Sequence, residues 1–450
     1  MEEAGTVTTV EAVLGAPSST LRVRRRRAPE GRFLAVALVL VVLLQRFAIS
    51  PGGNEVPVIV PILLVLVAVG LYRGRLRVHR LNASLIVLLV LTALIATLAQ
   101  MSQGDLPSVL SVASMTLIYI PAMVRSTGGA ATLRVVADVF VVLMTIAALV
   151  SLVQFVGQYA GIANVDWFTR LVPAQFLVQG YSPNAPVHYG QSLLRSNAFV
   201  FLEPSFLSLS LGMAVLVAVR TGRGWFQLTI LLAGMVPTLA GNGIAVLIPG
   251  LVITLFSPVR RNLLALLPGL IAAIVVATVS PLGRLYLGRS TEANSSGSSS
   301  SLRFVQPYTT LLPASLDSPF HTLFGHGAST SDPFLDNQGL IAVTRPIVPK
   351  VLFEYGMLGA VGIVLVLLVL FVGGLRHNVW MLGLLPTYFV INASFLQAEI
   401  AAFTIFWLCL IPRGADLDTF STPRWRRKQL VSEKRRLSTE RRILGREASV

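Results

Sequence analysis

The chain has 450 residues, of which 54% are hydrophobic and only 12% charged, and its mean hydropathy is +0.74. A soluble domain carries about 25% charged residues, so this composition excludes an ordinary soluble globular protein. The net charge of +16 raises the question of nucleic-acid binding. However, the basic residues gather at the chain ends and in short connections between apolar runs, which is typical of membrane topology signals. We therefore expect no nucleic-acid partner.

The chain begins with a polar segment, residues 1–30, which we expect to be a disordered, basic, cytoplasmic N-terminus. Residues 31–412 follow as a polytopic transmembrane domain, because their apolar runs are long enough to cross a bilayer of about 30 Å. Lipid cannot satisfy open backbone groups, so we predict an all-α integral membrane fold with about twelve transmembrane helices. The expected cores are residues 33–49, 56–72, 81–100, 107–124, 133–160, 197–219, 225–240, 242–257, 262–280, 347–372, 379–393 and 396–412.

The connections between these runs predict the orientation. Arginines concentrate in alternate connections, for example Arg73, Arg75 and Arg77 after the second run and Arg260 and Arg261 after the eighth. The positive-inside rule then places both termini in the cytoplasm of a multi-pass plasma-membrane protein. Residues 413–450 are expected to be a basic cytoplasmic tail, and both basic termini are expected to contact anionic lipid.

Two long polar loops are then extracytoplasmic, residues 161–196 and the larger residues 281–345 between the ninth and tenth helices. The apolar residues after Trp167 predict an interfacial helix in the first loop. The spacing of Phe304, Tyr308 and Leu311 predicts a short amphipathic helix in the second, bent or shortened by Pro307. These loops are where we expect chemistry.

The outer loops carry arginines, whose planar and permanently charged side chains suit phosphate. A common phosphate-bearing substrate at that leaflet is a sugar linked by diphosphate to a polyprenyl lipid. Its transfer requires neutralisation of the departing diphosphate, for which Arg195, Arg303 and Arg345 are candidates. It also requires a base for the acceptor hydroxyl, and His326, an imidazole between two glycines, is the best candidate.

Each candidate also has a structural interpretation. Arg195 and Arg345 could anchor the ends of spans at the membrane interface, and Arg303 could pair within its own loop. His326 could be a turn residue. Glu203 lies a few residues inside an apolar run and needs a partner there, so it either caps or kinks the span or serves as a site carboxylate.

The sequence gives little support for a metal. Asp332 and Asp336 are four residues apart and could bind a cation, but no Asp-x-Asp motif occurs in an outer loop. Cys409 is the single cysteine, which excludes cysteine-based metal sites. We expect neither a metal nor another cofactor. Glu399 in the last run is either a second acid inside the membrane or the mark of a misplaced boundary.

Three short motifs carry a family resemblance. The run Arg-Ser-Asn-Ala-Phe-Val-Phe-Leu-Glu-Pro-Ser of residues 195–205 resembles the segment that opens the middle span in the O-antigen ligase/polymerase (Wzy/WaaL-type) family of bacterial integral-membrane glycosyltransferases. A Ser-Leu-Arg-Phe element, then Leu-Phe-Gly-His-Gly at residues 323–327 and Lys-Val-Leu-Phe-Glu-Tyr-Gly-Met-Leu-Gly at residues 350–359, follow in the family's order. The resemblance covers roughly residues 30–412.

The resemblance implies a GT-C-like enzyme that joins polyprenyl-diphosphate-linked glycans. The resemblance also implies that Arg195 and Arg303 hold the diphosphate and that His326 activates the acceptor hydroxyl. Polymerisation of O-antigen or exopolysaccharide repeat units is the leading interpretation. The alternatives are a ligase that attaches finished glycan to another acceptor, and a non-enzymatic transporter or flippase of the glycan lipid. A chain-length regulator and a flippase are expected partners, and both outer loops are expected to converge over one cavity.

Overall fold

The computed structural model describes residues 29–50, 55–102, 107–162, 166–187, 192–279, 301, 305–340, 346–391 and 397–412. Residues 1–28 and 413–450 of the predicted terminal segments lie outside these residues, as do Arg303 and Arg345, whereas Pro29 and Glu30 belong to the first helix rather than to a disordered segment. The described chain is mostly helical, with two short two-stranded sheets.

The helices of the first half follow the apolar runs. They are α1 (Pro29–Leu43), α2 (Ile59–Tyr72), α3 (Arg80–Ser102), α4 (Val109–Tyr119), which continues as η2 (Ile120–Met123), α5 (Ala130–Tyr159), α6 (Trp167–Leu171), η3 (Ala174–Phe176), α7 (Pro204–Arg220), α8 (Trp225–Met235), which continues as η4 (Val236–Thr238), and α9 (Asn242–Leu255).

The helices of the second half also follow the apolar runs, with shorter helices in the polar segment between them. Its helices are η5 (Pro258–Leu266), α10 (Leu267–Val279), α13 (Gln306–Ala314), α14 (Pro319–Phe324), α15 (Ser331–Asn337), α16 (Ile347–Leu370), which continues as η7 (Phe371–Leu375), η8 (Val379–Met381), α17 (Leu384–Pro386), η9 (Thr387–Ile391), and α18 (Ala398–Ile405), which continues as η10 (Phe406–Leu410).

Three described helices are long and apolar enough to cross a membrane: α3, α5, and α16 together with η7. The others are shorter, although each predicted span contains one or more of them. The predicted all-α membrane character is thereby confirmed, whereas the count of twelve spans stays a prediction. Both predicted loop helices exist in shorter form, as α6 and as α13. Helix α13 begins at Gln306, so Pro307 lies in its first turn and does not bend the helix.

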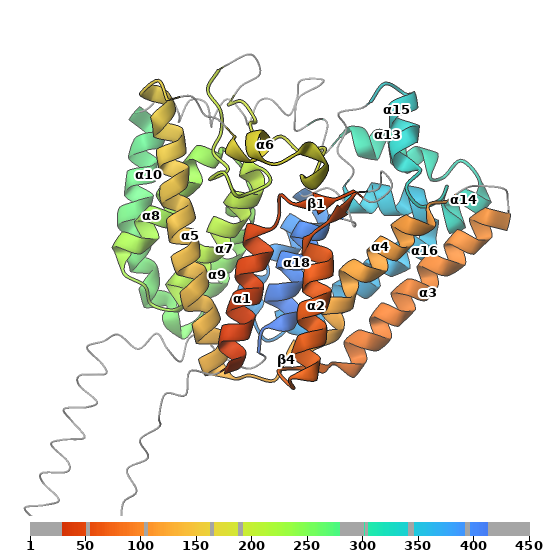
Figure 1. The fold of residues 1–450 in the computed structure, drawn as a ribbon, viewed down its shortest axis with the longest axis horizontal. Coiled ribbons are helices and arrows are strands. Elements are labelled where there is room, and N and C mark those ends of the chain that lie inside the picture. Colours follow the sequence, from red (N-terminus) through yellow and green to blue (C-terminus); the bar gives the residue numbers. More distant parts are fainter. Residues whose placement is uncertain are drawn as a thin grey trace, which may run out of the picture.

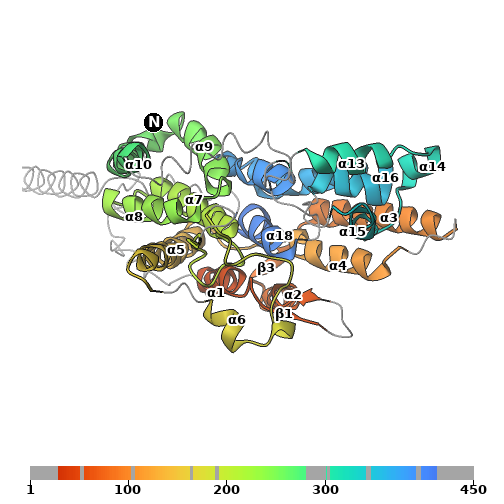
Figure 2. The same cartoon turned by 90° about the horizontal axis from the view of Figure 1, so that it is seen from above.

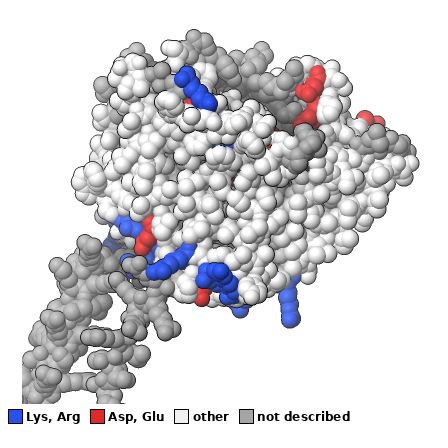
Figure 3. Space-filling view, viewed as in Figure 1, with Lys and Arg blue, Asp and Glu red and all other residues white. Residues whose placement is uncertain are grey.

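The molecule has two distinct ends (Figure 1). Strands β3 (Leu76–Val78) and β4 (Val124–Ser126) pair at one end, with Arg77 opposite Arg125, and we call it the basic end. Strands β1 (Ala48–Ile49) and β2 (Val56–Pro57) pair at the other end, where α6 and α13–α15 also lie; we call it the loop end. Figure 3 shows Lys and Arg side chains gathered at the basic end, next to a broad face free of charge.

Helix α18 lies at the centre of the molecule, and the view from above shows the other helices on either side of it (Figure 2). It packs against α1, α2 and α4, while every residue of α7 is buried among α5, α8 and α9. On the other side, α16 packs against α3 and α14. Helix α18 continues as η10, which contacts β4 at the basic end, so the N-terminus of α18 lies at the loop end.

Candidate active site

His326 lies in a cluster with Asp317 and His321, which we call the histidine cluster. Helix α14 begins after Ser318, whose side chain accepts a hydrogen bond from the backbone N–H of His321 (3.1 Å). One turn of helix then places Nδ1 of His321 2.8 Å from Oδ1 of Asp317, to which it donates. The rings of His321 and His326 lie 3.9 Å apart between centroids.

The hydrogen bond of His326 fixes its tautomer. Its Nε2 lies 2.9 Å from the carbonyl oxygen of Ala314, at the end of α13. A carbonyl only accepts, so Nε2 carries the proton and the lone pair of the neutral ring is on Nδ1. The ring stacks on Phe353 with centroids 4.4 Å apart and planes 18° apart, and Oδ2 of Asp317 lies 3.5 Å from Nε2. The hydrogen bond and the stacking thus orient the imidazole of His326.

A break in α16 holds this residue in place. Gly356 interrupts the helix with φ +60° and ψ −147°, a conformation that requires glycine. Near this break, the carbonyl of Phe353 accepts from the N–H of His326 (2.8 Å) and that of Glu354 accepts from the N–H of Gly327 (3.1 Å). Gly325 has φ +78° and packs against the backbone of Glu354. The glycines of the Leu-Phe-Gly-His-Gly motif therefore allow two backbones to approach closely.

Behind the histidine cluster lies an ion pair that the sequence reasoning missed. Lys350 and Glu354 occupy successive turns of α16, with Nζ 3.4 Å from Oε1, and Glu354 is 1% exposed. Ser331 donates to the same Oε1 at 2.6 Å, and Nζ lies 3.9 Å from Oδ1 of Asp332. The available signal was an i, i+4 Lys/Glu pair inside an apolar run.

Asp317 is ionised at neutral pH. Burial opposes its charge, but the hydrogen bond from His321 and the proximity of His326 outweigh this effect and hold the pKa of the carboxyl below its usual value. One oxygen of the carboxylate faces each histidine. The cluster therefore carries a fixed negative charge beside two imidazoles.

The histidine cluster has the composition of a metal site. One ligand atom from each of Asp317, His321 and His326 lies within 4.8 Å of the others, and a carboxylate with two imidazoles suits a zinc-like ion. Binding through Nε2 of His326 would require that nitrogen to release Ala314 and lose its proton. Asp332, which the sequence left open as a cation ligand together with Asp336, has its Oδ1 3.9 Å from Nζ of Lys350.

Glu203 and Arg195 lie at the loop end before α7. Glu203 occupies the position before the first turn of the helix, where Oε1 accepts from the N–H of Ser182 (3.2 Å) and Oε2 from the hydroxyl of Ser205 (3.1 Å). A carboxylate is favourable at a helix N-terminus. Nε of Arg195 donates to the carbonyl of Pro186 at 2.9 Å. These contacts anchor the loop, and the roles predicted for the two side chains in the reaction stay predictions.

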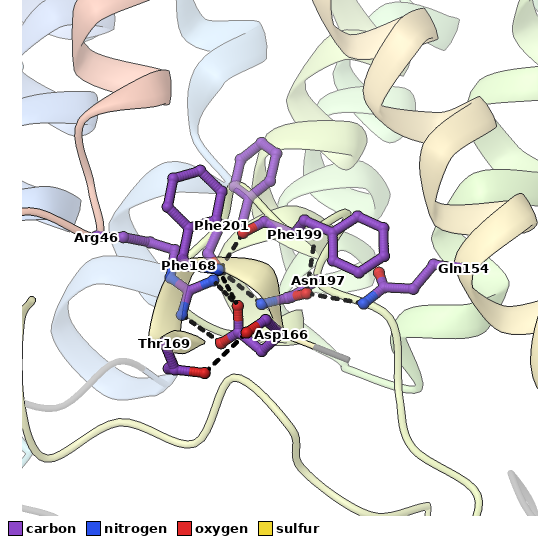
Figure 4. A network of polar contacts seen from close by, with 8 residues as sticks. All are labelled: Arg46, Gln154, Asp166, Phe168, Thr169, Asn197, Phe199 and Phe201. Carbon is purple, nitrogen blue, oxygen red and sulfur yellow. Dashed lines mark hydrogen bonds and ion pairs between the residues drawn. The ribbon is translucent and has the colours of Figure 1, made fainter. Parts of the chain in front are cut away.

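A second buried ion pair joins the first outer loop to the end of α1 (Figure 4). The guanidinium of Arg46 meets the carboxylate of Asp166 through two bonds, NH1 to Oδ1 at 2.8 Å and NH2 to Oδ2 at 2.5 Å. Arg46 is 3% and Asp166 5% exposed. Asp166 also caps α6, and NH1 donates to the carbonyl of Phe199 (2.8 Å). Sequence reasoning missed this pair because Arg46 lay within a predicted span.

The same network fixes the motif that precedes α7 (Figure 4). Asn197 accepts from Nε2 of Gln154 (3.2 Å) and from the N–H of Phe199 (3.0 Å), and it donates to the carbonyl of Phe201 (2.9 Å). Ala198 and Phe199 have φ +51° and +59°. Such non-glycine conformations cost about 1–3 kcal/mol each and persist only where surrounding contacts impose them. The Arg-Ser-Asn-Ala-Phe motif is thus a constrained turn.

The candidates fall into two groups at the loop end. Contacts of His326 run to α13, α14 and α16, whereas contacts of Arg195 and Glu203 run within the first outer loop and the start of α7. Figure 2 shows α6 and α13 at different places around α18. Because Arg303 and Arg345 lie outside the described residues, convergence over one cavity stays a prediction.

The apolar helices and the polar loop end together define a helical membrane protein. The chain matches the model of the WcaD colanic acid polymerase family over residues 33–412, and it belongs to this family of exopolysaccharide repeat-unit polymerases of the Wzy type. The predicted family is therefore confirmed, and with it a glycosyltransferase-type polymerase that acts on lipid-linked glycan repeat units in general. No curated protein matches the chain.

Proposed function

We propose that this protein polymerises exopolysaccharide repeat units at the outer leaflet, with a polyprenyl-diphosphate-linked glycan as donor and a second lipid-linked repeat as acceptor. The observation that carries the proposal is the oriented His326, whose Nδ1 holds the lone pair while Nε2 is bound to Ala314. Its position at the loop end suits a substrate whose sugars lie outside the membrane.

In this mechanism Nδ1 of His326 takes the proton from a hydroxyl of the acceptor sugar. The hydroxyl oxygen forms a bond to the anomeric carbon of the donor, and the bond from that carbon to the diphosphate oxygen breaks. The electron pair leaves with the polyprenyl diphosphate. Arg195, Arg303 and Arg345 neutralise the charge that develops on the diphosphate. Neither a nucleotide sugar nor a metal takes part.

Glu203 is the second proposed catalytic carboxylate. Each of its carboxylate oxygens accepts one hydrogen bond, from Ser182 and from Ser205, and both donors are neutral. The carboxylate can therefore accept a further hydrogen bond from a hydroxyl of the acceptor sugar. Such a bond would orient the acceptor rather than remove its proton. His326 and Glu203 come from different segments of the chain. A substrate that spans the loop end would contact both side chains.

Analysis of lipid-linked glycans in cells that lack this protein tests the proposal. A lost polymerase leaves single repeat units on the polyprenyl lipid at the outer face. A lost ligase would instead leave long undelivered chains, and a lost flippase would leave repeats on the cytoplasmic face. Mass spectrometry of the extracted lipids, combined with a sidedness assay, separates the three. Accumulation of long chains or of cytoplasmic repeats would refute polymerisation.

A further inference from the structure

A polar group outside the histidine cluster lies at the centre of the loop end, where α18 begins. It combines Tyr181 of the first outer loop with Gln397 and Glu399, which flank the N-terminus of α18. Two carboxylates hold the loop here: Glu55 accepts from the N–H of Gln179 (3.1 Å) and Glu203 from the N–H of Ser182 (3.2 Å). Tyr181 is thereby held between two fixed backbone positions.

The side chain of Tyr181 is oriented at both ends. Its ring meets Phe206 edge to face, with centroids 5.9 Å apart, and its hydroxyl oxygen accepts a hydrogen bond from Nε2 of Gln397 (2.8 Å). Burial, and then the charge of Glu399, raise the pKa of the phenol well above its usual value. The hydroxyl therefore keeps its proton at neutral pH and can donate it to an oxygen.

Two side-chain oxygens at the start of α18 are buried acceptors. Glu399 is 2% exposed, and no described residue donates to its Oε1. The amide oxygen Oε1 of Gln397 is likewise buried and without a donor in the part of the chain that the structure describes. A buried polar atom without a partner costs about 1–3 kcal/mol, so two such atoms at the start of one helix point to a ligand that supplies donors.

The chemistry of the group selects the ligand. Glu55 and Glu203 accept hydrogen bonds from the backbone on either side of Tyr181, so their carboxylates would repel a phosphate or another anion. A neutral polyol brings hydroxyl donors for the two oxygens and an acceptor for the phenol. The half-buried ring of Tyr181, which packs edge to face on the buried Phe206, offers an apolar surface for the carbon face of a sugar ring.

We propose that Tyr181, Gln397 and Glu399 form a subsite that binds one sugar of the lipid-linked repeat unit through its hydroxyl groups. The inference rests on the proposed function, because it assumes that the glycan is the substrate. It adds a binding role for the start of α18, whose buried Glu399 the sequence left as either a second acid inside the membrane or the mark of a misplaced boundary.

Direct binding measurements on the purified full-length protein test the subsite. The probes are a lipid-linked repeat unit and sugar-free polyprenyl diphosphate, applied to wild type and to the Glu399→Gln and Gln397→Leu variants. We expect each variant to bind the glycan lipid at least tenfold more weakly and the sugar-free lipid as well as wild type does. Thr404→Val, which removes another buried polar group of α18 outside the subsite, is the matched control and should bind both normally.

Two further outcomes separate the failures. Equal weakening of both ligands, or unchanged binding of the glycan lipid in folded variants, would overturn the subsite and leave the proposed function standing. Wild-type protein that binds no lipid-linked glycan would overturn both. Thermal unfolding of each variant checks that the loop end is intact.

Discussion

Arg46 is the residue on which the geometry of the first outer loop depends most. Its guanidinium connects the end of α1 with the cap of α6 through Asp166 and with the left-handed turn through Phe199. Desolvation makes a buried ion pair a modest source of net stability, but loss of one partner leaves the other charge buried and unpaired. The pair thus fixes the loop more than it adds to the free energy of unfolding.

The Arg46→Met variant should lower the free energy of unfolding by about 3–5 kcal/mol, because the Asp166 carboxylate would stay buried without its guanidinium. Chemical or thermal unfolding in detergent measures this. Arg170→Ala, which removes an exposed arginine from α6, should change stability by no more than about 0.5 kcal/mol. Equal effects of the two substitutions would show that the ion pair does not hold the loop.

Chelation should leave polymerisation unchanged. Nε2 of His326 donates to the carbonyl of Ala314, so the nitrogen nearest Asp317 already has a partner and a proton. The rate of purified protein before and after treatment with EDTA measures the effect. A loss of rate that zinc restores would instead assign a metal to the histidine cluster.

Among the elements, the break in α16 determines where His326 lies. A Cβ on Gly356 would come within 2.6 Å of the backbone of Leu323, and the residue has φ +60°. Gly339 has a similar φ, +71°, but nothing within 4 Å of the corresponding position. The two glycines therefore separate the cost of backbone strain from the cost of a steric clash.

Gly339→Ala should cost about 1–2 kcal/mol, the price of a left-handed conformation alone. Gly356→Ala should cost more by at least about 1 kcal/mol and should also lower polymerase activity, because the clash displaces the backbone that holds His326. Unfolding curves and initial rates of both variants provide the comparison. Similar losses in the two would mean that the close approach at Gly356 has no structural role.

Much of the helical framework could be predicted from hydropathy. The predicted span 133–160 corresponds to α5, and the predicted span 81–100 to α3. The runs 33–49 and 197–219 were too long, because α1 ends at Leu43 and α7 begins only at Pro204. Apolar composition does not distinguish helix from a buried turn, although a proline at the first helical position is a start signal.

The candidate site was predictable only in part. Glycines on both sides of His326 indicated a close backbone approach, and such an approach occurs at α16. Its partners Asp317, Ala314 and Phe353 lie 9, 12 and 27 residues away and meet it only through tertiary packing. Arg46 with Asp166 is likewise a pair 120 residues apart, which no local pattern could reveal.

For the whole molecule, the separation of charge between its two ends predicts its orientation. The basic end carries the β3–β4 arginines, and the loop end carries α6 and α13–α15 (Figures 1 and 3). The positive-inside rule assigns the basic end to the cytoplasm. Cys409 is the single cysteine of the chain, so the Cys409→Ser substitution provides a cysteine-free background.

In that background, Leu316→Cys places a thiol in the exposed turn between α13 and α14, and Thr127→Cys places one beside β4. In sealed right-side-out vesicles, a membrane-impermeant maleimide should label the cysteine at position 316 and not that at position 127. Permeabilised vesicles, in which both should react, provide the control. Labelling only at position 127 would invert the topology and the proposed location of the reaction.

The most direct test is polymerisation by the purified protein in vitro, with a defined polyprenyl-diphosphate-linked repeat unit as the only substrate. Wild type should convert single repeats into longer chains. His326→Ala should lose about 10²–10⁴-fold in rate, the contribution typical of a general base, while its unfolding temperature stays close to that of wild type. A folded His326→Ala protein that polymerises at the wild-type rate would contradict the mechanism.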